Sequence, residues 1–164
     1  MRHYPCHVLS GKPLALVERI QSLMLGNPAG LEFRVPSPPA HLTLMAPMVI
    51  DPSVLRGRIR EFESAFYKLS LSPRLAIYRD TVKIDLAPAS PDLIALRIKL
   101  GASDCAASIP LHITLFKDVD IPSTMLYWLC RQEIDLSAIV DRSGYSYDVL
   151  TTNCPPVQRS KPLK

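Results

Sequence analysis

The chain contains 164 residues, of which 48% are hydrophobic and 21% charged, and its formal net charge is +4. This size and composition are those of an ordinary globular protein with one domain or two small fused lobes. No run of about 18 apolar residues occurs, so we expect no membrane-spanning segment. The N-terminus also lacks the apolar core of a secretory signal. The mild positive charge fits a partner that carries phosphates, but it fits many other proteins equally well.

The first part of the chain alternates strand and helix signals. Residues 4–9 predict a strand. A helix is predicted from Pro13, because apolar residues then recur at helical spacing until Gly26-Asn27-Pro28 ends the pattern. The apolar stripe of this helix comprises Leu16, Val17, Ile20, Leu23 and Met24. Residues 40–50 are strongly apolar and predict a second strand.

A second helix is expected at Asp51-Pro52, where an N-cap residue precedes a proline at the first helical position. Its apolar stripe comprises Leu55, Ile59, Phe62, Phe66 and Leu69. Residues 74–78 and 81–86 then predict a hairpin around Arg79-Asp80. Ser90-Pro91 repeats the helix-start signal. The stripe of that helix comprises Leu93, Leu96 and Leu100.

The last part of the chain repeats this alternation. Residues 111–119 predict a strand that mirrors the earlier apolar one. Asp120-Ile121-Pro122-Ser123 predicts the start of a fourth helix, and residues 145–151 predict a last strand. The tail at 155–164 is basic and proline-rich, and we expect it to be disordered. We therefore expect a single domain over residues 1–154.

Cysteine usage gives no sign of a disulfide scaffold. The four cysteines are Cys6, Cys105, Cys130 and Cys154, with neither CxxC spacing nor a dense framework. This predicts reduced thiols in a cytoplasmic or nuclear protein. In His3-Tyr4-Pro5-Cys6-His7, the proline prevents a helical ligand pair, and no second pair follows. We therefore expect no metal ion and no cofactor.

Two short segments share one pattern of His, apolar residue, Thr and apolar residue. They are His41-Leu42-Thr43-Leu44 and His112-Ile113-Thr114-Leu115. Side chains alternate along a strand, so each segment presents an imidazole and a hydroxyl on one face and two apolar side chains on the other. Two such strands facing each other across a cleft would gather two imidazoles and two hydroxyls around one small volume.

These four groups suit phosphoryl chemistry. A neutral imidazole can accept a proton from an attacking hydroxyl or water, and an imidazolium can donate a proton to the leaving oxygen. Histidine titrates near neutrality, so one imidazole of each form can coexist at working pH. The threonine hydroxyls can donate hydrogen bonds to phosphate oxygens, where charge accumulates in the transition state.

A single copy of the pattern is weak evidence, because it more often marks one half-buried histidine on an amphipathic strand. Average residue usage would place the pattern on a given histidine roughly one time in fifty. Two matches among the four histidines are therefore an event of order a few in a thousand. Each copy also lies in a strand-like run, which favours a catalytic pair over two core histidines.

The doubled motif resembles that of the two-histidine (2H) phosphoesterase superfamily, and the RNA 2′,5′-ligase-like and 2′,5′-phosphodiesterase branch in particular. The resemblance covers about residues 3–153, and both motifs are intact. It extends to residues 41–47, where a proline closely follows the first motif, and to residues 81–86 before a leucine-rich helix. It implies an α+β, bilobal fold of two pseudo-symmetric antiparallel-sheet lobes, with outer helices around a central cleft.

The resemblance also implies roles for the motif residues. His41 and His112 would be the acid/base pair, and Thr43 and Thr114 would bind the phosphate. Which histidine is the base depends on the orientation of the substrate. On a 2′,5′ linkage, the neighbouring 3′-hydroxyl would attack phosphorus and leave a 2′,3′-cyclic phosphate. On a substrate that is already cyclic, water would attack instead.

Further residues are candidates for contacts with the substrate. Many family members carry a basic residue shortly after the second motif, and Lys117 is the candidate here. Simple alternation directs Lys117 away from the His112 face unless the strand bends. The same alternation directs Phe116 toward the cleft, either to stack on a base or to lie in the core. The remaining candidates for base or phosphate contacts are Tyr78, Arg79, Tyr145 and Tyr147.

The favoured function is cleavage of 2′,5′-linked nucleotides, such as a 2′,5′-oligoadenylate or a mixed-linkage cyclic dinucleotide. The alternatives are a 2′,3′-cyclic nucleotide phosphodiesterase of RNA processing and, in another class, a non-catalytic RNA-binding module on the same fold. A domain with two core histidines and no activity is the fourth interpretation. We expect a monomer that binds a nucleotide or short RNA, with no membrane and no obligate protein partner.

Overall fold

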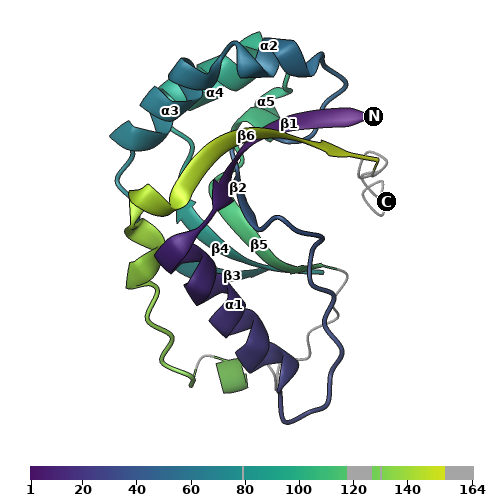
Figure 1. The fold of residues 1–164 in the computed structure, drawn as a ribbon, viewed down its shortest axis with the longest axis vertical. Helices are drawn as coiled ribbons and strands as arrows, with labels where there is room; N and C mark the ends of the chain where they lie inside the picture. The colour runs from purple at the N-terminus through teal and green to yellow at the C-terminus, as the bar shows by residue number, and fades with distance from the viewer. Residues whose placement is uncertain (79, 118–126, 130, 154–164) are drawn as a thin grey trace, which may run out of the picture.

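A computed structural model shows an α+β fold, in which six strands form one antiparallel sheet flanked by helices (Figure 1). It describes residues 1–78, 80–117, 127–129 and 131–153. Arg79, the helix start predicted at Asp120 and the tail at 155–164 lie outside these residues. The predicted α+β class is therefore confirmed for the described part of the chain.

The strands pair in the order β3-β4-β5-β2-β1-β6. Their bounds are β1 Arg2–Leu9, β2 His41–Thr43, β3 Arg74–Tyr78, β4 Thr81–Ala87, β5 Leu111–Lys117 and β6 Tyr145–Thr152. The strands predicted at 4–9, 74–78, 81–86 and 145–151 are confirmed, with ends that differ by at most two residues. The two strands that carry the motifs, β2 and β5, meet at the centre of the sheet.

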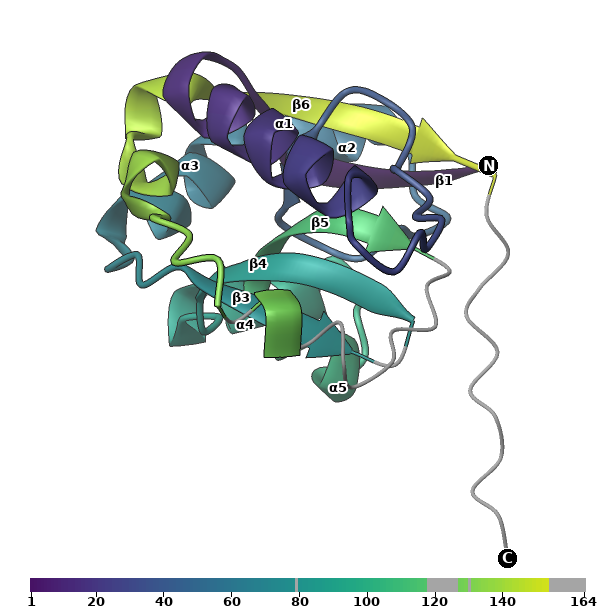
Figure 2. The ribbon, with the colours of Figure 1, turned by 90° about the horizontal axis from the view of Figure 1, so that it is seen from below.

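Helices lie on both sides of the sheet. Their bounds are α1 Gly11–Leu25, α2 Pro52–Arg56, α3 Ile59–Lys68, α4 Pro91–Lys99 and α5 Asp104–Ala107, followed by the 3₁₀ turns Ser137–Val140 and Arg142–Gly144. In Figure 1, α2, α3 and α4 lie together on one side of the strands and α1 lies on the other. Figure 2 shows the sheet from the α1 side. None of the described helices is long and apolar enough to cross a membrane.

Two helix starts are confirmed together with their caps. The Asp51 carboxylate accepts a hydrogen bond of 2.8 Å from the backbone N–H of Ser53. The Ser90 hydroxyl accepts one of 3.2 Å from the N–H of Leu93. Both caps precede a proline, which needs no intrahelical partner because it has no N–H. These local signals place α2 and α4 on the chain.

The predicted helix after Asp51 is wrong in one respect, because it is broken in two. Gly57 and Arg58 separate α2 from α3, and glycine disfavours a helix interior by about 1 kcal/mol relative to alanine. The break takes Ile59 out of the expected apolar stripe and leaves it 38% exposed, whereas Phe62 and Phe66 are buried. Likewise, Leu23 lies at the exposed margin of the α1 stripe.

The strand predicted over residues 40–50 is also shorter than expected, since β2 ends at Thr43. Beyond it the chain still follows β1, with a hydrogen bond of 3.1 Å from the Leu44 N–H to the Pro5 carbonyl. Pro47 has no N–H to donate, so a regular ladder cannot continue through it. Further along, an isolated antiparallel bridge pairs Met48 with His3 of β1.

The apolar members of the two motifs lie in the core. All four, Leu42, Leu44, Ile113 and Leu115, are fully buried. Their burial directs the alternate side chains of each strand to the opposite face. The two strands do not face each other across a cleft, as the sequence suggested, because β2 and β5 are hydrogen-bonded neighbours in one sheet.

Candidate active site

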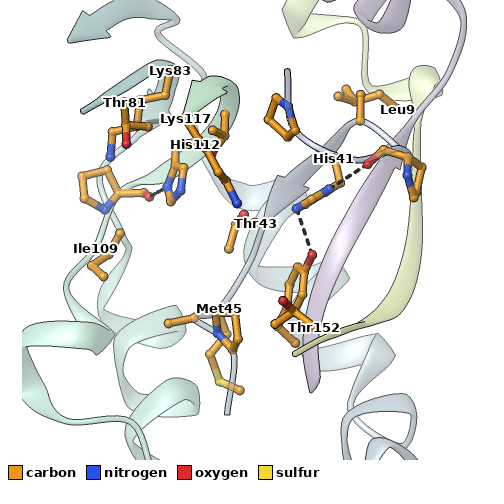
Figure 3. Close-up of a pocket in the computed structure, with 18 of the residues that line it drawn as sticks. Leu9, His41, Thr43, Met45, Thr81, Lys83, Ile109, His112, Lys117 and Thr152 are labelled. Atoms are coloured by element: carbon orange, nitrogen blue, oxygen red, sulfur yellow. Dashed lines mark hydrogen bonds between the residues drawn. The ribbon is translucent and has the colours of Figure 1, made fainter. Parts of the chain in front are cut away.

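A cavity of about 1360 Å³ opens over the paired strands β2 and β5. The four polar residues of the motifs, His41, Thr43, His112 and Thr114, all line it. In Figure 3, His112 and His41 lie on opposite sides of the view with Thr43 between them. The alternation that buries the apolar motif residues therefore brings both imidazoles and both threonines to one cavity.

The register of β2 and β5 sets how these groups face each other. Thr43 lies opposite His112, and Leu42 lies opposite Ile113. The same register, continued by one residue, brings His41 level with the Thr114 position. Each histidine therefore neighbours the threonine of the other motif, and the two histidines occupy diagonal positions, which ordinary sheet geometry separates by about 7–8 Å.

Both imidazoles are held by the same backbone contact. Nδ1 of His41 lies 2.9 Å from the Pro39 carbonyl, and Nδ1 of His112 lies 2.9 Å from the Pro110 carbonyl. A carbonyl oxygen can only accept, so Nδ1 carries the proton in each ring and the neutral form presents the lone pair of Nε2. Two unrelated core histidines would not be expected to share this geometry.

The sequence carries a signal for this contact just before each of the two motifs. The segments read Pro-Ala-His-Leu-Thr-Leu over 39–44 and Pro-Leu-His-Ile-Thr-Leu over 110–115. A proline stands two residues before each histidine, and its carbonyl is the one that fixes the ring. The repeated unit is thus six residues long, which makes the similarity of the two halves more specific.

The Nε2 atoms of the two rings differ in their surroundings. The Tyr4 hydroxyl lies 3.3 Å from Nε2 of His41, and it donates to that atom when the ring is neutral. Nε2 of His112 has no hydrogen-bond partner among the described residues. The two backbone contacts are therefore alike, but the surroundings of the two Nε2 atoms differ.

Burial favours the neutral form of His112. It lowers the pKa of this imidazole to about 4, and the Pro110 carbonyl and Asp85 only partly oppose that effect. Lys83 and Arg97 lower the pKa further through charge repulsion. The free site consequently holds this ring unprotonated at neutral pH, and an anionic phosphate beside it would raise its pKa again.

The His41 ring is affected in the same direction. Burial lowers its pKa, the Pro39 carbonyl opposes the shift, and the Lys117 charge adds to it. Both shifts favour the neutral imidazole. A bound phosphodiester would supply the negative charge that lets one of the two rings take up a proton.

The two threonine hydroxyls are available to a ligand. Thr43 and Thr114 line the cavity, and neither hydroxyl has a hydrogen-bond partner within the described part of the chain. A hydroxyl in a partly buried cavity is stabilised by a partner, and a phosphate oxygen is a strong acceptor.

Lys117 lines the cavity because β5 contains a bulge. Val82 of β4 pairs with Phe116, but the next residue, Lys83, pairs with Thr114, so Leu115 is an extra residue in β5. Such an insertion reverses the alternation after it. Lys117 therefore returns to the face of Thr114, and in Figure 3 it lies between His112 and His41.

The same bulge moves Phe116 into the core, so of its two expected placements the structure has the core one, and Phe116 does not line the cavity. Its side chain is fully buried, with its ring centroid 5.0 Å from that of Phe33. Tyr147 is misassigned, because it lies outside the cavity and its hydroxyl donates to the Leu55 carbonyl at 2.7 Å. Tyr145 is buried and donates to a backbone carbonyl in the same way.

Tyr78 does line the cavity, as part of a polar cluster beside His112. Its hydroxyl donates to Asp85 at 3.2 Å. The ammonium of Lys83 lies 3.7 Å from the same carboxylate and 4.0 Å from the centre of the Tyr78 ring. Lys83 also lines the cavity, although it lies outside both motifs and was not predicted as a site residue. Its signal is the alternation in β4, where Lys83 pairs with Thr114.

Comparison of the chain with protein-family models, curated proteins and solved structures found no match. Within the described ranges, no group of three or more His, Cys, Asp or Glu side chains is placed to hold a metal ion. What the fold and the cavity define is an α+β protein with a paired-histidine site.

Proposed function

We propose that this chain is a metal-independent phosphodiesterase of the 2H type, which cleaves 2′,5′-linked nucleotides with His41 and His112 as general acid and base. The observation that carries the proposal is the common geometry of the two imidazoles. Each donates Nδ1–H to a proline carbonyl and lies on one face of the same strand pair. Two rings with matched orientation in one cavity suit two proton transfers at a single phosphate.

The strand order supports the two-lobe interpretation. The sheet divides between β5 and β2 into two sets of three strands, β3-β4-β5 and β2-β1-β6. The motif strands are the innermost strand of each set, and the Thr43–His112 register relates them by an approximate local twofold axis. This is the arrangement that two pseudo-symmetric lobes joined at their motif strands would have.

The reaction on a 2′,5′ linkage uses both histidines. The neutral imidazole accepts the proton of the 3′-hydroxyl as its oxygen bonds to phosphorus. The protonated imidazole donates its proton to the 5′-oxygen as that bond to phosphorus breaks. The products are a 2′,3′-cyclic phosphate and a free 5′-hydroxyl. The hydroxyls of Thr43 and Thr114 hydrogen-bond the non-bridging oxygens, which gain charge in the transition state.

The test is cleavage of 2′,5′-linked oligoadenylate and of its 3′,5′-linked isomer in excess EDTA, followed by chromatography. We expect cleavage of the 2′,5′ oligomer only. His41→Ala and His112→Ala should each lower kcat/KM at least about 100-fold, the usual effect of losing a general acid or base. His3→Ala is the matched control, because His3 lies outside the cavity and bonds Thr151 instead.

Other outcomes would identify the alternatives. Activity that requires a divalent metal, or that survives in both folded histidine variants, would contradict the proposal. Turnover of 2′,3′-cyclic nucleotides alone would assign the site to RNA processing, with water as the nucleophile. Tight RNA binding without any cleavage would identify a non-catalytic binding module.

A further inference from the structure

Arg97 of α4 is a buried cation at the wall of the cavity, and only 1% of it is exposed. Its guanidinium donates three hydrogen bonds to backbone carbonyls. Nε donates to Leu44 at 2.7 Å, and Nη1 donates to Ala107 at 2.8 Å and to Ile109 at 2.6 Å. Arg97 thus joins the end of β2 to the segment that enters β5.

The charge of Arg97 is not matched by an acid. Within the described residues, no carboxylate lies at ion-pair distance from it. Nη2 has no hydrogen-bond partner among the described residues. It also does not belong to the fully buried side-chain atoms without a partner, which are atoms of His7 and Asp85. Burial lowers the pKa of Arg97 only to about 10, so the group stays charged at pH 7. A buried cation with a free pair of N–H donors is stabilised strongly by an anion.

Arg97 reaches the cavity from a different element than the two lysines, namely the helix α4. Lys83 and Lys117 approach from β4 and from the far end of β5. Arg97 bonds Ile109, which precedes His112 by three residues, about 10 Å along an extended chain. In Figure 3, Ile109 lies on one side of His112 and Thr81 and Lys83 lie on the other.

The cavity as a whole carries more positive than negative charge. Its cationic residues are Arg2, Lys83, Arg97 and Lys117, and its acidic ones are Glu18 and Asp80. Cationic side chains therefore reach the cavity from β1, β4, β5 and α4. A substrate with a single phosphate between the histidines and beside the lysines would leave Nη2 of Arg97 without a partner among the described residues.

We propose that Arg97 binds a second phosphate group of the substrate, next to the phosphate held between His41 and His112. The substrate class is then a nucleotide chain or bisphosphate with at least two phosphates, rather than a lone 2′,3′-cyclic mononucleotide. The position of the reacting phosphate rests on the proposed function. Nε and Nη1 already donate to carbonyls, so the two N–H bonds of Nη2 are the donors left for a charge-assisted hydrogen bond to that phosphate.

Isothermal titration calorimetry tests the proposed second-phosphate site without requiring turnover of a substrate. The probes are adenosine 2′,5′-bisphosphate, adenosine 2′-monophosphate and adenosine 5′-monophosphate, titrated into the full chain at fixed ionic strength. We expect the bisphosphate to bind at least 10-fold more tightly than either monophosphate. Arg97→Gln, which keeps amide donors for the carbonyls, should remove this advantage, and Arg97→Lys should keep part of it. Arg60→Lys, at an exposed position of α3, is the control.

The results separate this inference from the proposed function. Equal binding of bisphosphate and monophosphates by the wild-type chain would overturn the second-phosphate site, whether or not the Gln variant folds. If folded Arg97→Gln still bound the bisphosphate more tightly than the monophosphates by the same factor, the second-phosphate site would also be overturned. Arg97 would then only hydrogen-bond the three backbone carbonyls. Loss of the advantage in that variant, with no cleavage by the wild type, would sustain the phosphate site and overturn the phosphodiesterase.

Discussion

Thr43 and His112 are register partners in the β2–β5 ladder, so one motif provides the hydroxyl beside the imidazole of the other. The approximate twofold relation predicts that the two threonines contribute similarly. Thr43→Val and Thr114→Val should each lower kcat/KM by about 100-fold, as the loss of a donor to a developing oxyanion does. Thr→Ser at either position keeps the hydroxyl and should stay close to wild type. Loss of activity in only one of the two Val variants would contradict the symmetric arrangement.

The lysines can reveal which histidine is the base. Burial is the main cause of the lowered pKa at both rings, and Lys117 adds to it at His41 while Lys83 adds to it at His112. Lys117→Met removes a positive charge, so the pKa of His41 rises. The limb of the kcat/KM pH profile that reports the pKa of His41 should then move to higher pH. Movement of the acidic limb identifies His41 as the base, and movement of the alkaline limb identifies it as the acid.

The companion variant provides the control for that assignment. Lys83→Met should raise the pKa of His112 and move the opposite limb to higher pH, because each lysine acts on a different ring. The measurement is kcat/KM on a 2′,5′-linked dinucleotide across the pH range in which the variants stay folded. A shift of the same limb in both variants would contradict the division of roles between the two histidines.

The buried side chain of His7 lies outside the cavity, and we expect it to make the stability of the fold sensitive to acid. It pairs with Leu42, so it lies on the sheet face opposite His41, with its ring 4.6 Å from that of Phe66. Neither ring nitrogen has a hydrogen-bond partner in the described part of the chain, and burial lowers the pKa to about 4. An unfolded histidine titrates near pH 6.5, so between pH 6.5 and 4 the unfolded chain binds a proton that the folded chain excludes.

The free energy of unfolding should therefore fall as pH drops through this window, with a His7 contribution on the order of 3 kcal/mol at pH 4. His112 contributes in the same sense. His7→Leu should raise stability at neutral pH by on the order of 1–2 kcal/mol, since it removes two buried ring nitrogens that have no hydrogen-bond partner. It should also reduce the slope between pH 6.5 and 4 in urea titrations. A slope equal to that of the wild type would contradict this account.

Gly144 is required by close packing against the start of α1. A Cβ at this position would lie 2.6 Å from Cδ of Pro13 and 2.6 Å from the Ser10 carbonyl. Gly144→Ala should lower the free energy of unfolding by about 1–3 kcal/mol, as measured by urea denaturation. Gly57→Ala is the matched control, because its Cβ would come no closer than 3.4 Å to a neighbouring atom, the Ser53 carbonyl oxygen. That variant should be neutral or more stable by about 0.4–1 kcal/mol.

Local patterns in the sequence were sufficient to predict many of the helices and strands. Capping by Asp51 and Ser90 depends only on residues two or three positions away, and both caps are present. Alternation over the motifs predicted which side chains are buried, because the period of a strand is a local property. The break at Gly57 and the early end of β2 were missed, because glycine and proline effects compete with hydrophobic periodicity and the balance depends on packing.

The sequence by itself determined that His41, Thr43, His112 and Thr114 have matched environments, since the repeated motif fixes alternation on each strand. Only the tertiary structure decided that the two strands, 71 positions apart (112 − 41), are direct neighbours. It also decided that the bulge returns Lys117 to the cavity and that Arg97 reaches the cavity from the helix α4. Pairing register, bulges and contacts between distant elements depend on how the whole chain packs, which a local pattern does not encode.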